Sequence, residues 1–143
     1  MVFMEKGIYR LDVPSTNPAN FSLMESEENF GCIAPNSILQ VGSDLFFAGT
    51  ENAYVIDSGF NILPITEPNK DVYQAETNIE NSRFFYDPKK STILCRFGDD
   101  KQNIYALDIL RQAWYQLGMG STDVADLFAI DESLNVYSIT NAS

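Results

Sequence analysis

Short runs of hydrophobic residues alternate with polar residues along the whole chain. The runs are rich in Val, Ile, Tyr and Phe, and Gly, Asn, Asp, Ser and Pro separate them, which is typical of β-strands joined by tight turns. Two series of such runs are complete. The first predicts strands over 37–41, 45–48, 53–56 and 61–65, and the second over 83–86, 92–97, 104–107 and 114–117. Each series is expected to form a four-stranded antiparallel meander.

Both ends of the chain carry similar runs. Residues 2–5, 7–13 and 21–24 predict the later strands of one further meander, and residues 126–130 and 134–139 predict the middle of another. Between the two complete series, residues 67–80 have helical spacing, so we expect a short helix or a long connector there.

One segment fits two interpretations. Leu107, Leu110, Trp114 and Leu117 also fall at helical spacing, so 106–117 could form an amphipathic helix that stops at Gly118. The alternative is a strand, a turn and a second strand. We favour the strands because 103–108 resembles three other strand-like segments.

These similar segments point to a structural repeat. Their sequences are GIYRLD (7–12), NAYVID (52–57), NIYALD (103–108) and NVYSIT (135–140). Five of the seven tyrosines have Leu or Ile two places later, and the spacing between copies runs from 32 to 51 residues. Periods near 40 residues are typical of the four-stranded blades of β-propellers. The Asp or Thr that ends each copy is expected to stop the strand by accepting hydrogen bonds from nearby backbone amides.

The predicted fold class is therefore all-β, with β-propeller-like antiparallel four-stranded blades in a partial propeller. We expect a single β domain over 1–143 with about two full and two partial blades. Its divisions are a partial blade (1–30), a blade (31–66), a connector (67–80), a blade (81–118) and a partial blade (119–143).

Composition excludes several classes of site. The chain has no histidine, so Ser-His-Asp and Cys-His catalysis and histidine metal ligation are excluded. Cys32 and Cys95 have no zinc-site spacing and are expected to be buried apolar residues. No stretch of about eighteen apolar residues predicts a membrane span. The formal net charge of −11 disfavours nucleic-acid binding through phosphates.

The remaining candidate chemistry has simpler explanations. Two oxygen-rich turns could hold calcium, but both lack the length and distal Glu of a dedicated calcium loop, so we interpret them as hairpin turns. They contain Asp99, Asp100 and Asn103, and Asp131, Glu132 and Asn135. No pair of acidic residues is placed across one cleft as glycoside hydrolysis needs. We predict that the chain is not an enzyme and has no catalytic, cofactor-binding or metal-binding residues, no cofactor and no small-molecule substrate.

The aromatic residues allow one binding function. Tyr54 and Phe60, if exposed, could stack against sugars, which gives the alternative of a carbohydrate-recognition propeller that binds host surface glycans. A protein-interaction propeller is a third possibility. The adjacent pairs 46–47 and 84–85 are expected to place one Phe between blades and one on an outer face.

One stretch resembles a specific family. It runs from Gly31-Cys-Ile-Ala-Pro35-Asn-Ser37-Ile through Val41-Gly42-Ser-Asp-Leu45-Phe-Phe and Tyr54-Val-Ile-Asp-Ser-Gly59 to Pro64-Ile65-Thr66. This stretch is similar to the β-propeller virion proteins of tailed bacteriophages, the tail nozzle and head-closure components of short-tailed phages. Outside 31–66 the resemblance is to propellers in general.

The resemblance implies a structural role in the phage particle. The chain would be a non-enzymatic virion component, part of a symmetric tail or head-tail junction assembly around the DNA path. Its partners would be copies of itself in a ring and other virion proteins, and DNA would pass without specific binding. It would be made in the bacterial host cytoplasm. Because a closed propeller needs four or more blades, we expect this chain to be an excerpt of a longer protein, or a partial propeller completed by other chains.

Overall fold

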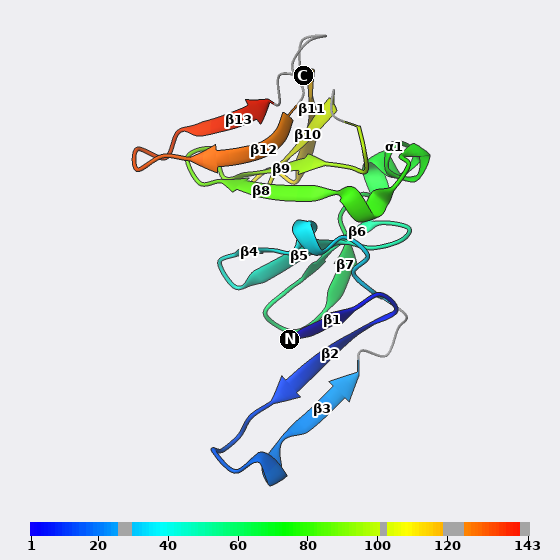
Figure 1. Cartoon of the computed structure of the whole chain (residues 1–143), viewed down its shortest axis with the longest axis vertical. Coiled ribbons are helices and arrows are strands. Elements are labelled where there is room, and N and C mark those ends of the chain that lie inside the picture. Colours follow the sequence, from blue (N-terminus) through cyan, green and yellow to red (C-terminus); the bar gives the residue numbers. More distant parts are fainter. Residues whose placement is uncertain (26–29, 101–102, 119–124, 141–143) are drawn as a thin grey trace.

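The computed structural model describes residues 1–25, 30–100, 103–118 and 125–140. The strands form four antiparallel sheets (Figure 1). The first sheet contains β1 (Val2–Met4), β2 (Gly7–Asp12) and β3 (Ser22–Glu25). The second contains β4 (Leu39–Val41), β5 (Asp44–Ala48), β6 (Ala53–Ile56) and β7 (Ile62–Pro64). The third contains β8 (Arg83–Asp87), β9 (Thr92–Arg96), β10 (Asn103–Asp108) and β11 (Ala113–Gly118), and the fourth contains β12 (Ala125–Ile130) and β13 (Val136–Thr140).

This arrangement confirms the predicted fold class of antiparallel, four-stranded, blade-like sheets. The second and third sheets are both meanders, with strand orders β4-β5-β6-β7 and β8-β9-β10-β11. Their strands lie within a residue or two of the predicted ranges. The connector between them holds a 3₁₀ turn (Glu67–Asn69), the helix α1 (Lys70–Ala75) and another 3₁₀ turn (Ile79–Asn81), as its helical spacing predicted. Two more 3₁₀ turns, Pro18–Asn20 and Pro35–Ser37, precede β3 and β4.

The helical alternative for 106–117 is wrong. Residues 103–108 and 113–118 are strands that pair with each other in the register Leu107 with Trp114 and Ile104 with Leu117. Leu110 lies in the turn between them and is 81% exposed, so it takes no part in an apolar helix face. The apparent helical spacing arises because a four-residue turn separates two strands of alternating residues.

The sheets follow one another along the longest axis of the molecule. Figure 1 shows β1–β3 at one end, β4–β7 in the middle, and β8–β11 together with β12–β13 at the other end. Within the described residues the arrangement is therefore an open stack, and the two outermost sheets lie far apart.

The largest core lies between the two four-stranded sheets. Phe46, Ala48 and Ala53 of the second sheet pack against Phe84, Cys95 and Tyr105 of the third, and Tyr73 of α1 completes this core. Aromatic rings dominate its centre. Phe97 is fully buried and its ring centroid lies 5.2 Å from that of Tyr105 and 5.0 Å from that of Tyr73. Such offset and edge contacts add to the stabilisation from burial.

Two smaller cores join the outer sheets to the stack. Phe3 and Ile8 of the first sheet pack against Phe47, Tyr54 and Ile56. At the other end, Leu94, Ile104 and Ala106 form a cluster on which Val136 of β13 packs. Each of the two four-stranded sheets thus has one apolar face toward the sheet before it in the chain and one toward the sheet after it.

Two polar bonds fix the seam between the four-stranded sheets. The indole Nε1–H of Trp114, on β11, donates to the carbonyl of Ile65 at 2.9 Å, just beyond β7. The Tyr73 hydroxyl donates to the Gly49 carbonyl at 2.6 Å while its ring is fully buried. These bonds satisfy two carbonyls that lie outside the sheet ladders, so the seam buries few unpaired groups.

Each four-stranded sheet also begins with a buried serine that its sequence context did not predict. Ser37 Oγ accepts from the Ala48 amide at 2.7 Å and donates to the Ala34 carbonyl. Ser82 Oγ accepts from the Gly98 amide at 2.8 Å. Ser37 ends a 3₁₀ turn and Ser82 directly follows one, in each case before the first strand of the sheet. Each serine satisfies an amide at the end of the second strand or just beyond it. Both serines follow an asparagine, which is the shared local signal.

Close backbone approach requires glycine at two joints. A Cβ on Gly31 would lie 1.9 Å from the Glu5 carbonyl oxygen, where the first sheet meets the second. A Cβ on Gly98 would lie 2.2 Å from the Thr77 carbonyl oxygen, and Gly98 has a φ of +54. A side chain at either position would force the connecting segments apart.

The fourth copy of the repeat differs from the others. Tyr54 and Tyr105 are buried on the face toward the preceding sheet, whereas Tyr137 is 52% exposed and Val136 packs toward that sheet instead. A displacement of one residue along a strand turns every side chain to the opposite face. The expectation that all four copies are equivalent is therefore wrong for NVYSIT.

Candidate functional site

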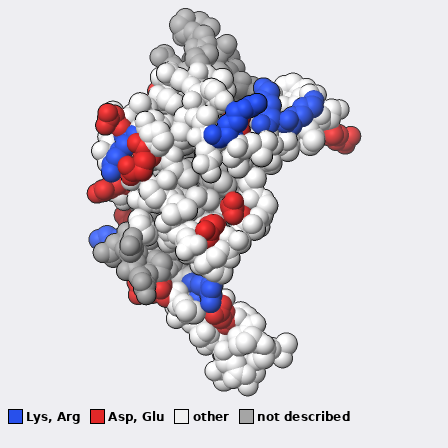
Figure 2. All heavy atoms as spheres, turned by 180° about the vertical axis from the view of Figure 1, so that it is seen from behind, with Lys and Arg blue, Asp and Glu red and all other residues white. Residues whose placement is uncertain are grey.

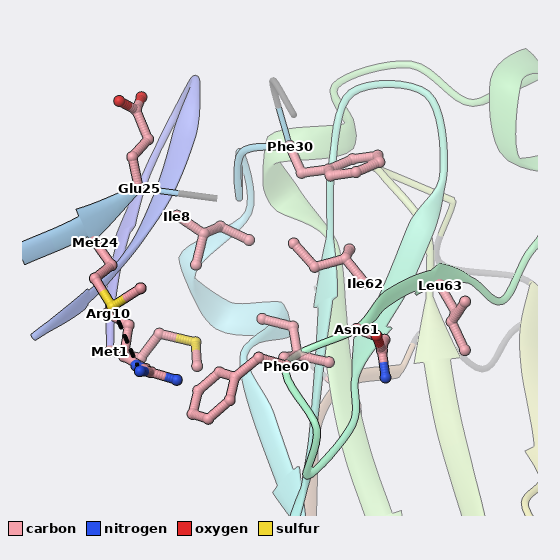
Figure 3. A pocket seen from close by; sticks show the side chains of 11 residues that line it. Met1, Ile8, Arg10, Met24, Glu25, Phe30, Phe60, Asn61, Ile62 and Leu63 are labelled. Carbon is pink, nitrogen blue, oxygen red and sulfur yellow. Dashed lines mark hydrogen bonds between the residues drawn. The ribbon is translucent and has the colours of Figure 1, made fainter. Parts of the chain in front are cut away.

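The first candidate site is a cleft between the first and second sheets. It has a volume of about 510 Å³. Ile8, Arg10 and Met24 of the first sheet line one side, and Phe60 and Ile62 line the other (Figure 3). Phe30, Asn61 and Leu63 extend the second side. The cleft combines apolar walls with a few polar groups, as ligand-binding clefts do.

Arg10 is the central polar group of this cleft. Its guanidinium lies 4.4 Å from the centroid of the Phe60 ring, at cation–π distance. Its Nη2 atom donates to Asp12 Oδ2 at 2.8 Å and to Met24 Sδ at 3.4 Å. The salt bridge to Asp12 is about two-fifths exposed, so solvent screens it. The guanidinium is thus held over Phe60 from the first sheet.

The turn that presents Phe60 is built by Asp57. Asp57 Oδ1 accepts from the backbone amides of Gly59 at 2.8 Å and Asn61 at 2.9 Å, and Asn61 Nδ2 donates to Asp57 Oδ2 at 2.8 Å. Phe60 then adopts a φ of +64. The Asn61 side chain and amide hold the pKa of Asp57 below its ordinary value. This confirms that the Asp ending NAYVID stops the strand through amide bonds.

The same turn occurs at Asp131, one of the predicted calcium candidates. Asp131 Oδ1 accepts from the amides of Ser133 at 2.9 Å and Asn135 at 2.8 Å, and Asn135 Nδ2 donates to Oδ2 at 2.9 Å. Leu134 has a φ of +61, matching Phe60. These bonds, with that of the Tyr137 hydroxyl, lower the pKa of Asp131 to about 2, and the Asn135 amide is their largest contributor.

The carboxylates of the other candidate turn are also engaged by amide donors. Asp99 accepts from the side-chain amides of Asn78 and Asn81. Asp100 accepts from the Asn103 amide at 3.1 Å and from Asn103 Nδ2 at 2.6 Å. Within the described residues no group of three or more His, Cys, Asp or Glu side chains is arranged to hold a metal ion. Both candidate turns are thus Asx-type turns that shape the loops.

Asp108, which ends the third copy, acts in the same way. Its Oδ1 accepts from the Arg111 amide at 2.9 Å, and the Arg111 guanidinium donates to its Oδ2 at 2.7 Å. These bonds hold the pKa of Asp108 below its ordinary value.

Glu76 shows the opposite shift. Burial raises the pKa of Glu76, and the neighbouring Asp100 raises it further.

A second cleft lies between the third and fourth sheets. Its volume is about 620 Å³, and Leu94, Ile104, Tyr115, Leu117 and Val136 form its apolar lining. Two cations, Lys90 and Arg111, and two carboxylates, Asp87 and Asp108, contribute the charged side chains of its lining. The β12–β13 hairpin covers part of the third sheet here, and Tyr115 and Leu117 are 46% and 45% exposed.

The third notable surface is the outer face of the first sheet. Val2, Met4, Leu11 and Leu23 lie on this face and are 47%, 55%, 43% and 61% exposed. Strand register places Val2 opposite Tyr9 and Leu11 opposite Leu23. Tyr9 donates its hydroxyl to Glu25 at 2.9 Å, which is the first cause of its raised pKa. A continuous apolar sheet face in water marks an interaction surface.

Other expectations have clear outcomes. Cys32 and Cys95 are both buried free thiols, as predicted, and burial raises the pKa of each. Tyr54 is only 8% exposed, so the prediction that it could stack against a sugar is wrong. Phe60 is 48% exposed and so remains accessible.

None of the helices in the described ranges is long and apolar enough to span a membrane. Phe46 and Phe47 point to opposite faces as expected, but both are buried, in different cores, so the expectation that one of them lies on an outer face is wrong.

Charge does not form a single acidic wall on the surface seen from behind. Figure 2 shows one group of Lys and Arg near the top of this face, further Lys and Arg next to Asp and Glu elsewhere, and uncharged surface between these groups. Comparison of the chain with models of known protein families and with curated proteins finds no match.

Sequence reasoning missed both clefts and the outer apolar face. The clefts depend on which sheets lie side by side, and no local pattern specifies this. The apolar face did have a signal, because Val2, Met4, Tyr9 and Leu11 alternate as in the buried copies. Its exposure follows only once the neighbours of the sheet are known.

Proposed function

We propose that the chain is a non-enzymatic structural component of a phage virion and belongs to a symmetric tail or head-tail junction assembly around the DNA path. One observation carries the proposal. The molecule is a stack of antiparallel sheets joined by apolar cores, while large apolar surfaces are exposed at its ends. Such a molecule is suited to join neighbours rather than to bind and convert a substrate.

The polar groups support an assembly role. Asp57, Asp108 and Asp131 each use their oxygens to accept backbone amides in turns, with depressed pKa values. Groups tuned in this way stay ionised at neutral pH and do not exchange protons with a substrate. The resemblance over 31–66 adds the virion context, and the net charge of −11 suits a component that DNA passes without adhering to it.

The test is to look for the protein in purified particles. Virions from a lysate of the host that encodes this sequence are banded by density and analysed by quantitative mass spectrometry against the portal protein. We expect peptides of the chain at a fixed ratio to the portal in particles, and the same ratio after a high-salt wash. Particles that lack the chain, with the chain present in the soluble lysate, would contradict the virion role.

The exposed Phe60 favours a second candidate function, recognition of a glycan. The cleft of about 510 Å³ offers this ring, the Arg10 guanidinium and the Asn61 amide side by side. A Phe60→Asn variant retains a residue that tolerates the positive φ at this position while removing the ring. Glycan-array binding by the wild-type protein that is lost in Phe60→Asn would support this candidate, and no binding by the wild-type protein would reject it.

A further inference from the structure

The connector between the two four-stranded sheets lies against the turn that leaves β9 in the third sheet. The Asp99 amide donates to the Thr77 carbonyl at 3.2 Å, and the Asn78 side chain donates to Asp99 Oδ2. A Cβ on Gly98 would lie 3.4 Å from the Glu76 Cβ, so the Glu76 side chain starts directly beside this turn. Glu76 is thus placed at the joint between the end of α1 and the third sheet.

At this joint the side chain of Glu76 is hydrogen-bonded to the side chain of Asp100. Both residues are half-buried. Two ionised carboxylates can only accept hydrogen bonds, so one of the two groups must carry a proton for this bond to form. Asp100 already accepts at both oxygens, from the Asn103 amide at 3.1 Å and from Asn103 Nδ2 at 2.6 Å. Glu76 is therefore the group that holds the proton and donates.

The surroundings of Glu76 also favour its neutral form. Burial is the main cause of its raised pKa, and the charge of Asp100 is the next. On β10, Tyr105 lies near both groups, because after burial they are the causes of its own raised pKa.

The other charged groups around the joint have partners or positions of their own. Asp99 accepts from the side-chain amides of Asn78 and Asn81, and Arg96 donates to the Asn81 carbonyl at 2.9 Å. Lys70 and Asp71 lie in the first turn of α1, where Lys70 is 3.7 Å from Glu67, and Glu80 is exposed in the following 3₁₀ turn. Lys101 follows Asp100 in the sequence and lies outside the described residues.

This joint bears on the seam between the two four-stranded sheets. Tyr73, three residues before Glu76, donates its hydroxyl to the Gly49 carbonyl of the second sheet at 2.6 Å. The Tyr73 ring packs against Phe97, which ends at the same turn as Asp100, with 5.0 Å between the ring centroids. The bond between Glu76 and Asp100 thus holds α1 to the third sheet while Tyr73 holds it to the second.

We propose that Glu76 and Asp100 form a proton-dependent latch between α1 and the third sheet. The latch is closed while the two carboxyl groups share one proton. It opens when Glu76 releases this proton to water, because two carboxylates that face each other repel. The latch is a property of the fold and does not rest on the virion role.

The direction of the pH dependence follows from the position of the proton. The folded chain binds the Glu76 proton more tightly than the unfolded chain, because the folded pKa is raised. The latch therefore stabilises the fold fully below the unfolded pKa, and this contribution is lost as the pH rises through the folded pKa. Asp57, Asp108 and Asp131 behave in the opposite way, since their depressed pKa values make their contributions disappear in acid.

The first experiment locates the proton. Carbon-detected NMR titration should give a Glu76 midpoint above its ordinary value of 4.5 in the wild-type chain. In Asp100→Asn the neighbour is a neutral amide that can donate to the Glu76 carboxylate, so the midpoint should fall. Glu80→Gln removes one charge from an exposed position of the same connector and should leave the midpoint raised. A wild-type midpoint at or below 4.5, or one that Asp100→Asn does not lower, would overturn the latch.

The second experiment measures what the latch does to the seam. Urea unfolding is followed by the fluorescence of Trp114, whose ring lies 6.0 Å from that of Phe97, over a range from about pH 4 to pH 8. Glu76→Gln keeps a donor for Asp100 at every pH. It should unfold at a higher urea concentration than the wild type at the upper end of the range and together with it at the lower end.

The control and the contrary result use the same measurement. Glu80→Gln should follow the wild type over the whole range, and circular dichroism checks that each variant folds. If Glu76→Gln differs from the wild type by the same amount at every pH, the proton does not operate the joint and the proposal is wrong.

Discussion

The two inner sheets and the two outer sheets use similar sequences with different results. Tyr54 and Tyr105 are each 8% exposed in the inner sheets, whereas Tyr137 in the last sheet is 52% exposed. The local segments NAYVID, NIYALD and NVYSIT all form strands. What differs is the face on which the tyrosine lies. Tyr54 and Tyr105 face the preceding sheet, whereas in the last sheet Val136 faces the third sheet and Tyr137 lies on the opposite face. The local pattern thus specifies that the strand forms, and the register of the strand specifies whether its tyrosine is buried.

The largest expected effect lies in the aromatic centre between the inner sheets. Truncation of the fully buried Phe97 to Ala should lower the free energy of unfolding by about 3–5 kcal/mol, because it removes contacts with Tyr73, Tyr105 and Trp114 and leaves a cavity. Urea unfolding followed by far-ultraviolet circular dichroism measures the change. Leu110→Ala, in an exposed turn, should stay within about 0.5 kcal/mol of the wild type.

The comparison of tyrosines can be tested directly. Tyr105→Ala should lower the free energy of unfolding by about 2–4 kcal/mol because the ring packs between the two inner sheets. Tyr137→Ala should leave the midpoint of the main urea transition unchanged. Equal shifts of the midpoint in the two variants would show that the last sheet is covered as fully as the third.

The paired serines give a smaller effect. Ser82→Ala removes the buried acceptor of the Gly98 amide, and Ser37→Ala removes that of the Ala48 amide. An unpaired buried amide costs about 1–3 kcal/mol, and we expect each variant to lose stability in this range. Ser43→Ala, at an exposed turn, is the control. If Ser82→Ala unfolds at the wild-type urea concentration, the hydroxyl does not support the sheet as described.

The smallest expected effect is on an outer hairpin at acidic pH. The pKa of Asp131 is lowered to about 2 in the folded chain, below its ordinary value of 3.8. A group with a depressed folded pKa stabilises the fold above its unfolded pKa, and this contribution is lost as pH falls toward about 2. Carbon-detected NMR titration should give an Asp131 midpoint well below the ordinary value of 3.8. An Asp131 midpoint at this ordinary value would contradict the turn geometry.

The sequence predicted most of the local fold for a physical reason. Alternation and turn residues report on hydrogen-bonded strands and tight turns, and both are local properties. The strands of 83–118 therefore formed as expected, and the alternation placed Phe46 and Phe47 on opposite faces. The helical spacing of Leu107, Leu110 and Trp114 was ambiguous because it spans a turn, and only cross-strand pairing resolves it.

The candidate site was less predictable because it depends on distant contacts. Tyr54 looked like an exposed aromatic residue until the first sheet was placed over it. Phe60 is presented by the Asp57 turn, whose Asp and Asn were visible in the sequence, but the Arg10 guanidinium that covers its ring comes from another sheet. The buried Ser37 and Ser82 also act across a strand pair, so their local context alone did not reveal them.

The hydrogen bond from Trp114 to Ile65 places a fluorescent side chain at the joint between the two four-stranded sheets. Trp114 is the single tryptophan of the chain, and its indole donates across the joint between the two inner sheets. Its emission therefore reports separation of these sheets and is blind to fraying of the first or last sheet. Fluorescence and circular dichroism followed together would divide unfolding into opening of the centre and loss of the ends, without any added label.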